Sequence, residues 1–106
     1  MTTRIRLPMR RPHDSFRCQI EGIEYAIGIG RAGEGGPVAE IWLDASKVGS
    51  SIAALANDAA IMGSLLLQHG CPIETIRHAL TRNNDGAFAS AIGKVFDEIV
   101  KMETSA

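Results

Sequence analysis

The chain has 106 residues, which accommodates one domain with one hydrophobic core and leaves no room for two domains. Hydrophobic residues make up 45% of the chain and charged residues 22%, as in ordinary globular proteins. The net charge of −1 excludes a global electrostatic field that would attract nucleic acid or a membrane surface.

The cysteine and targeting signals point to a reducing compartment. Cys18 and Cys71 do not make a disulfide framework, and no C-x-x-C pair is present. The basic N-terminus continues into Pro8 and Pro12 instead of the apolar segment of a signal peptide. The longest apolar stretch, 59–67, is too short to span a bilayer. We therefore expect a cytoplasmic protein with reduced thiols and no membrane association.

The first segment of the chain, residues 1–13, is predicted to be a basic arm that contains prolines. A single α+β domain is predicted over residues 14–102, and a frayed tail over residues 103–106. Four arginines within the first eleven residues could hold an acidic partner or a nucleic-acid backbone. No aromatic residue lies between them to stack on bases, so nucleic-acid binding is not expected and the arm is interpreted as solvated.

Three segments with a period of two predict strands. The first covers 15–21, and the second, 25–30, alternates large residues with Ala26, Gly28 and Gly30, so we expect a helix or another backbone close to that small face. The third covers 38–44 and is rich in β-branched and aromatic residues. It places Ile41 and Leu43 on one face of the strand. The other face carries Glu40, Trp42 and Asp44.

The period changes to 3.6 after Lys47, which predicts a helix ending before Gly70, with Ser46 or Ser50 as the cap. Its main apolar stripe contains Ile52, Leu55, Ala59, Met62 and Leu66, widened by Ala56, Gly63 and Leu67. Few polar positions remain: Asn57, Asp58, Ser64 and Gln68. A helix that is apolar over most of its circumference is predicted to be central and buried.

Two further helices are predicted after Gly70. The first begins at Pro72, which suits the first helical position. The second carries Phe88, Val95 and Phe96 at helical spacing after the loop 81–86, with Asp85 as a candidate cap. The predicted order is βββααα: a three-stranded antiparallel sheet with three helices packed on one face. The other face, which carries Trp42, and the two sheet edges make a homodimer the expected oligomer.

The glycines Gly28, Gly30 and Gly33 match the G-x-G-x-x-G pattern of dinucleotide-binding folds. That fingerprint must open a helix inside a βαβ unit, whereas here the glycines lead to Pro37 and another strand. We interpret them as a small-residue strand and a hairpin turn. No cofactor is expected, no metal site is predicted, since His69 and Cys71 are too few ligands for zinc, and no catalytic residue is proposed.

The best ligand-site candidate is the start of the first predicted helix. Exposed N–H groups at a helix N-terminus attract anions, and a lysine adds a charge-assisted contact to a phosphate or carboxylate. The candidate residues for an anion or a nucleotide are Lys47, Gly49, Ser50 and Ser51. The alternative interpretation is a helix capped by Ser50 beside a solvated Lys47.

Several segments together resemble the TSCPD domain found near the C-terminus of cobalamin-dependent (class II) ribonucleotide reductases. They are RLPMRR at 6–11, AEIWLDASKVGSS at 39–51 and LLLQHGCPIETI at 65–76. The resemblance runs over roughly residues 6–99 and carries over Glu40, Asp44, Lys47 and Gly49. It implies association with deoxyribonucleotide synthesis, in an accessory role. It does not carry over the reaction, because Cys18 and Cys71 match no reducing thiol pair.

We derive three hypotheses from the sequence, of which the third, an enzyme in its own right, is the least favoured. The first is a stand-alone, non-catalytic interaction module related to ribonucleotide reductase, which binds itself, a reductase or another protein through the face with Glu40, Trp42 and Asp44. The second is a small-ligand sensor that binds a nucleotide or phosphate at Lys47, Gly49, Ser50 and Ser51. The second predicts that Lys47→Ala removes nucleotide-induced thermal stabilisation.

Overall fold

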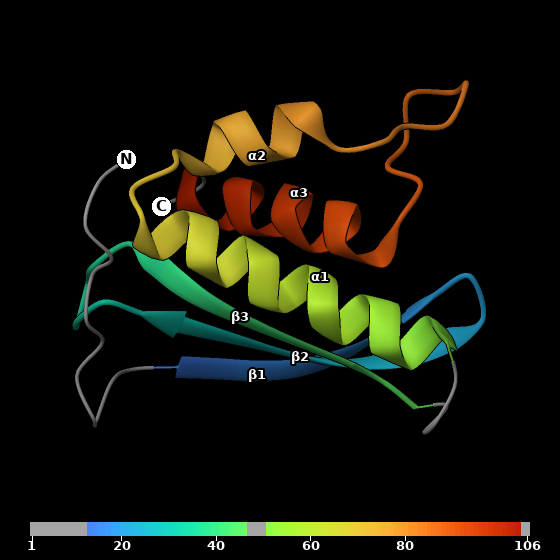
Figure 1. The fold of residues 1–106 in the computed structure, drawn as a ribbon, viewed down its shortest axis with the longest axis horizontal. Helices are drawn as coiled ribbons and strands as arrows, with labels where there is room; N and C mark the ends of the chain where they lie inside the picture. The colour runs from blue at the N-terminus through green and yellow to red at the C-terminus, as the bar shows by residue number, and fades with distance from the viewer. Residues whose placement is uncertain (1–12, 47–50, 105–106) are drawn as a thin grey trace. The chain divides into compact units, whose positions relative to one another are not determined.

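The structure is a computed structural model that describes residues 13–46 and 51–104. In chain order its elements are β1 (His13–Ile20), β2 (Ile23–Arg31), β3 (Val38–Ala45), α1 (Ser51–Gln68), α2 (Ile73–Ala79) and α3 (Ala91–Thr104) (Figure 1). The strands precede the helices, which confirms the α+β class and the order βββααα. The chain divides into two compact units, Met1–Gly70 and Cys71–Ala106.

The ends of the elements refine the predicted boundaries. His13 is the first residue of β1, and residues 1–12 of the predicted arm lie outside the described residues. At the other end, α3 continues through Thr104, into the segment predicted as a tail.

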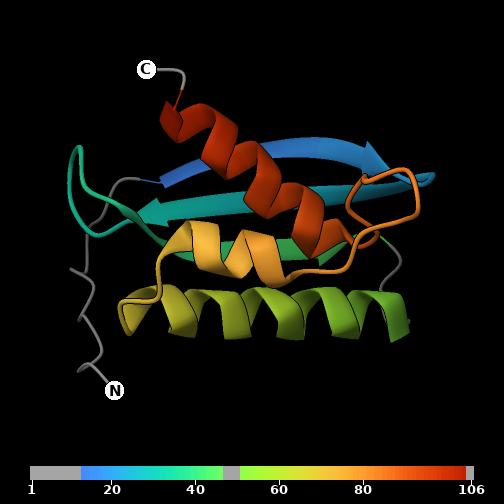
Figure 2. The ribbon, with the colours of Figure 1, turned by 90° about the horizontal axis from the view of Figure 1, so that it is seen from above.

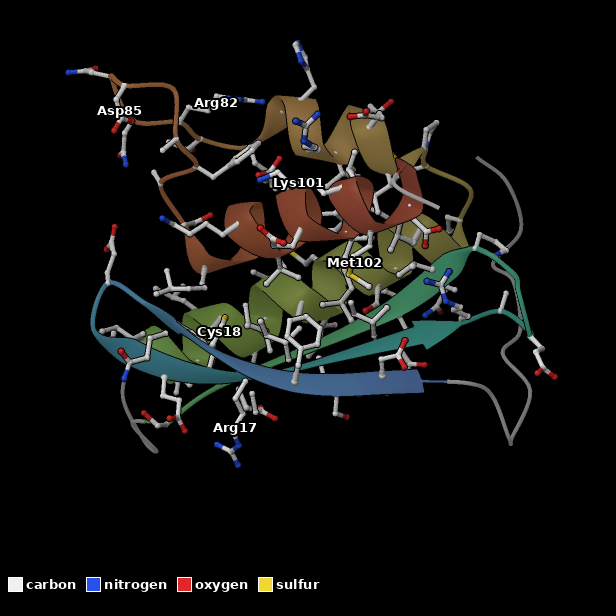
Figure 3. The ribbon with its side chains drawn as sticks, turned by 180° about the vertical axis from the view of Figure 1, so that it is seen from behind. Arg17, Cys18, Arg82, Asp85, Lys101 and Met102 are labelled. Carbon is white, nitrogen blue, oxygen red and sulfur yellow. The ribbon has the colours of Figure 1, made fainter. Side chains whose placement is uncertain are left out.

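The first unit contains an antiparallel sheet with the strand order β1-β2-β3, as expected for a meander. Ile27 lies opposite Phe16 on one side and Leu43 on the other, and Ile27 and Leu43 are buried. The opposite face carries Trp42, whose side chain is 39% exposed. The alternation is visible on β1, where the successive residues Arg17 and Cys18 point to opposite faces (Figure 3). The predicted division of the strands into two faces is therefore confirmed.

Helix α1 runs along β3 at the edge of the sheet, on the side away from β1 (Figure 2). Two polar side chains attach it to the strand backbone. The Ser64 hydroxyl accepts the Ile41 N–H at 2.8 Å and lies within donating distance of the carbonyl oxygens of Ile41, at 3.1 Å, and Ala60, at 2.8 Å. Gln68 Nε2 donates to the Ala39 carbonyl at 3.0 Å. The helix thus satisfies backbone groups that an edge strand would otherwise leave unpaired.

The orientation of α1 corrects the predicted burial. The side that faces inward consists of small residues, one leucine and the two polar anchors: Ala56, Ala60, Gly63, Leu67, Ser64 and Gln68. Ser64 and Gln68, two of the few polar positions on the helix, are buried. The large residues of the predicted core stripe are exposed instead, with Leu55 at 70% and Met62 at 60%. The prediction of a largely buried helix was wrong because small residues allow α1 to approach β3 closely, and only that side is covered.

The second unit contains α2, α3 and the loop between them. Asp85 does not cap α3: its carboxylate accepts the Ala87 N–H within the loop, while the Ser90 hydroxyl accepts the Gly93 N–H at 3.1 Å at the helix start. Phe88, predicted on the helical stripe, precedes α3 and forms an isolated bridge with Arg82, whose guanidinium lies 4.2 Å from the centre of the phenyl ring.

Ion pairs connect α2 to α3 within this unit. Asp97 accepts a hydrogen bond from Arg77 Nε at 3.0 Å and lies 3.2 Å from Lys101 Nζ. Burial raises the pKa of the Asp97 carboxyl, but the hydrogen bonds from Lys101 and Arg77 outweigh this and hold the pKa below its ordinary value of 3.8. The pair therefore stabilises the ionised form of Asp97.

Candidate interaction site

The side chain of Trp42 lies across β2. Trp42 is directly opposite Gly28, and a Cβ at Gly28 would lie 2.7 Å from Trp42 Cε3, which is shorter than van der Waals contact. A Cβ at Gly30 would lie 3.5 Å from the Cη2 atom of the same ring. The small face of the second strand was predicted to accommodate a helix or another backbone; it accommodates the indole ring of its neighbour.

Beside Trp42, the first unit forms a groove between β3 and α1 with a volume of about 190 Å³. The lining residues come from these two elements alone: Glu40, Ile41, Trp42, Asn57, Ala60, Ile61, Ser64, Leu65 and Gln68. The floor is fixed, because Ser64 and Gln68 are both hydrogen-bonded to the β3 backbone. The position of the groove therefore follows from the attachment of α1 to the sheet edge.

The groove combines apolar walls with one carboxylate. Trp42 forms one wall, and Ile61 and Leu65, which are both exposed, form the other. Glu40, at an intermediate exposure, lies on the same strand face as Trp42. An aromatic face beside a carboxylate favours a basic side chain flanked by apolar ones, since both groups attract a cation.

The predicted interface residues are only partly brought together. Glu40 and Trp42 line the groove, whereas Asp44, although exposed on the same strand, does not. The sequence interpretation missed Ile61 and Leu65. Their spacing of four residues forms a second apolar stripe, and this signal was present in the sequence.

The predicted anion site is described at one position only. Lys47, Gly49 and Ser50 lie outside the described residues. Ser51 is the first residue of α1 and is exposed, and the first turn of α1 contains no acidic residue. The binding of an anion or a nucleotide at this position stays a prediction.

Two other features bear on the kind of site. Among residues 13–46 and 51–104, no group of three His, Cys, Asp or Glu side chains could hold a metal ion. Over the same residues, α1 is long and apolar enough to cross a membrane by length and composition alone, a test that core helices of soluble proteins also pass. A third of it, 33%, is buried against the rest of the chain.

No family model matches the chain, and no solved structure matches it. The chain is similar to a vitamin B12-dependent ribonucleotide reductase from Agrobacterium fabrum (strain C58 / ATCC 33970), with 35% identity over 78 residues. The aligned region is 74% of this chain but 6% of the reductase. The similarity thus relates nearly three quarters of the chain to a small part of a much longer enzyme.

Proposed function

We propose that the chain is a TSCPD-like, non-catalytic accessory module of ribonucleotide reduction that acts in the cytoplasm by binding a protein partner. The similarity to a vitamin B12-dependent ribonucleotide reductase carries the proposal, and such a reductase is the first partner to test. The groove beside Trp42 is the proposed contact surface. It offers exposed apolar side chains on two elements whose backbones are fixed to each other by Ser64 and Gln68.

The groove supports binding of an extended partner segment with one basic residue. The ring of Trp42 is supported on one side by the Gly28 position, and Trp42 is still 39% exposed. Partly exposed tryptophans on a preformed surface contribute strongly to protein interfaces, since they bury a large area at low entropic cost. Glu40 supplies the charge that would select a basic residue.

The test uses the only tryptophan in the chain as a reporter. Trp42 is replaced by 5-fluorotryptophan during expression, and ¹⁹F NMR spectra are recorded as unlabelled Agrobacterium fabrum reductase is added. We expect a saturable shift or broadening of the single ¹⁹F signal. A signal that stays unchanged at saturating reductase would contradict binding through this face.

A matched pair of variants distinguishes binding through the groove from nonspecific binding by exposed apolar side chains. Trp42→Ala should weaken binding to the reductase at least tenfold, measured by calorimetry. Phe16→Ala is the control, because Phe16 has a similar exposed fraction, 36%, and pairs with Ile27 of the buried sheet face. Equal losses from both substitutions would overturn the assignment of the groove.

The sensor hypothesis gives a different result in a thermal-shift experiment. A nucleotide present at a hundred times its dissociation constant stabilises a protein by about 2.7 kcal/mol, which is several degrees for a domain of this size. A rise in melting temperature that Lys47→Ala removes would favour a nucleotide sensor. Binding to the reductase together with unchanged melting temperatures would favour the interaction module.

A further inference from the structure

The outer side of α1 carries a stripe that has the spacing of a helix-packing seam. Its residues follow one another at intervals of three and four: Ile52, Leu55, Ala59, Met62 and Leu66. This is the repeat by which two helices pack together in coiled coils and bundles. All four large residues are exposed, from 42% at Ile52 to 70% at Leu55.

The helix cannot bury this stripe by turning about its own axis. Such a rotation would withdraw Ser64 from the Ile41 N–H and Gln68 from the Ala39 carbonyl. Both anchors are buried, so the backbone groups they satisfy would lose their partners without gaining water. The stripe is therefore held on the outer side of α1, away from β3, where its large side chains are exposed to another molecule.

We propose that this stripe of α1 is a homodimer interface in which two copies of the helix pack antiparallel around a two-fold axis at Ala59. The stripe is self-complementary, as an isologous interface requires. Ile52 of one protomer would meet Leu66 of its partner, and Leu55 would meet Met62. The small Ala59 at the centre allows the two helix backbones to approach each other closely.

The charges on α1 argue against a membrane surface as the cover. Helices that lie on membranes carry lysine and arginine on their polar side. Helix α1 contains no basic residue, and its one charged residue is the exposed Asp58. An anionic lipid surface would repel this side chain. In the helix pair, the Asp58 side chains of both copies would lie at the solvent-exposed rim, where salt screens their mutual repulsion.

The available area predicts a reversible dimer. A helix of 18 residues is about 27 Å long, and half of its lateral surface is about 450 Å². Two protomers would together bury about 900 Å², below the 1,200–2,000 Å² of standard stable interfaces. We therefore expect monomers and dimers to exchange with concentration.

Sedimentation equilibrium on the full chain tests the proposal, at concentrations from about 1 to 500 μM. We expect a dimer whose dissociation constant rises at least tenfold in Leu55→Lys, a change that the exposed position tolerates in the folded monomer. Ile61→Lys is the matched control: it lies about 120° further round the same helix, in the groove, and should leave dimerisation unchanged. The reverse pattern is expected for reductase binding, so the two proposals fail separately.

A cross-link reports the predicted geometry directly. Under mild oxidation, Ala59→Cys should give a covalent dimer, because a two-fold axis at this residue places the two thiols within disulfide distance. Ile61→Cys should not. A chain that stays monomeric over the whole range, or dimerises equally well with Leu55→Lys, would overturn the proposal. So would sedimentation with 3:1 phosphatidylcholine–phosphatidylglycerol vesicles that Leu55→Lys abolishes, since this would make the stripe a lipid-binding surface.

Discussion

The two long helices α1 and α3 distribute their side chains in opposite ways. In α3, the apolar residues Val95, Phe96 and Ile99 are buried, while Asp97 and Lys101 form an ion pair. In α1, the polar residues Ser64 and Gln68 are buried, and all the large apolar residues except Leu67 are exposed. Amphipathicity alone therefore does not indicate which side of a helix faces its own chain. The inward side of α1 is selected by the edge of a strand, which needs hydrogen bonds more than apolar contact.

Truncation of one large apolar residue in each helix should show the largest contrast. Phe96 is fully buried, and Phe96→Ala should lower the free energy of unfolding by about 3–5 kcal/mol, because it creates a cavity. Leu55→Ala should change it by less than about 0.5 kcal/mol in dilute solution, since the side chain is already in water. Urea denaturation of the two variants measures both values. Comparable losses would show that the outer side of α1 is buried in the monomer.

The anchoring of α1 is tested at Ser64. Ser64→Ala removes the acceptor of the buried Ile41 N–H, and we expect it to destabilise the chain by about 1–3 kcal/mol. Hydrogen exchange of the Ile41 amide should accelerate in parallel. Asn57→Ala, at an exposed groove residue two turns before Ser64 on the same helix, is the control and should be neutral or slightly stabilising. Unchanged exchange at Ile41 would mean that α1 does not protect the strand edge.

The support of Trp42 is tested at Gly28. A methyl group at this position collides with the indole ring, so Gly28→Ala should move the ring outward and cost about 1 kcal/mol. The tryptophan emission should shift to longer wavelength. Gly33→Ala provides the comparison, because nothing lies within 4 Å of a Cβ there, and it should leave both emission and stability nearly unchanged. Identical spectra for the two variants would contradict the stacked position of Trp42.

The smallest expected effect concerns the ion pairs of α3 and depends on pH. Because the pKa of Asp97 is lowered in the folded chain, its contribution to stability is present above the unfolded pKa and is lost as the pH falls through the folded pKa. In Asp97→Asn, the melting temperature should therefore fall less steeply as the pH drops below about 4. The difference from the unchanged chain should be about 1–2 °C. Glu98→Gln, at a more exposed carboxylate near the same lysine, should leave this pH dependence as it is. An unchanged pH dependence in Asp97→Asn would rule out the pair as a contributor.

The strands could be predicted from the sequence because their geometry leaves one choice. Side chains alternate between the faces of a sheet, so the burial of Ile41 and Leu43 requires Trp42 to lie on the other face. A helix can present several different sides to a sheet. Which side of α1 faces inward depends on the backbone groups of β3 that still need hydrogen-bond partners. The decisive signal in α1 was a row at four-residue spacing that begins with Ala56 and Ala60 and ends with Ser64 and Gln68.

The candidate site was predictable only in part for the same reason. Trp42 and Glu40 follow from the alternation of β3, but the second wall of the groove depends on how α1 is rotated. Asp85 was misassigned as a helix cap because an acidic residue before an apolar run has the same pattern whether it closes a turn or starts a helix. Its hydrogen bond to Ala87 is a local turn contact that sequence spacing cannot distinguish from a cap.

The covered side of β3 also limits how the sheet can be extended. Among the described strands, β1 pairs with β2 alone, while the far edge at β3 is occupied by α1 through Ser64 and Gln68. If two chains joined at β1, they would make one continuous sheet, with three strands from each chain and a helix closing both outer ends. Neither end could then receive another strand. Through the described strands, the sheet can therefore be extended by one further copy only, as long as α1 stays attached to β3.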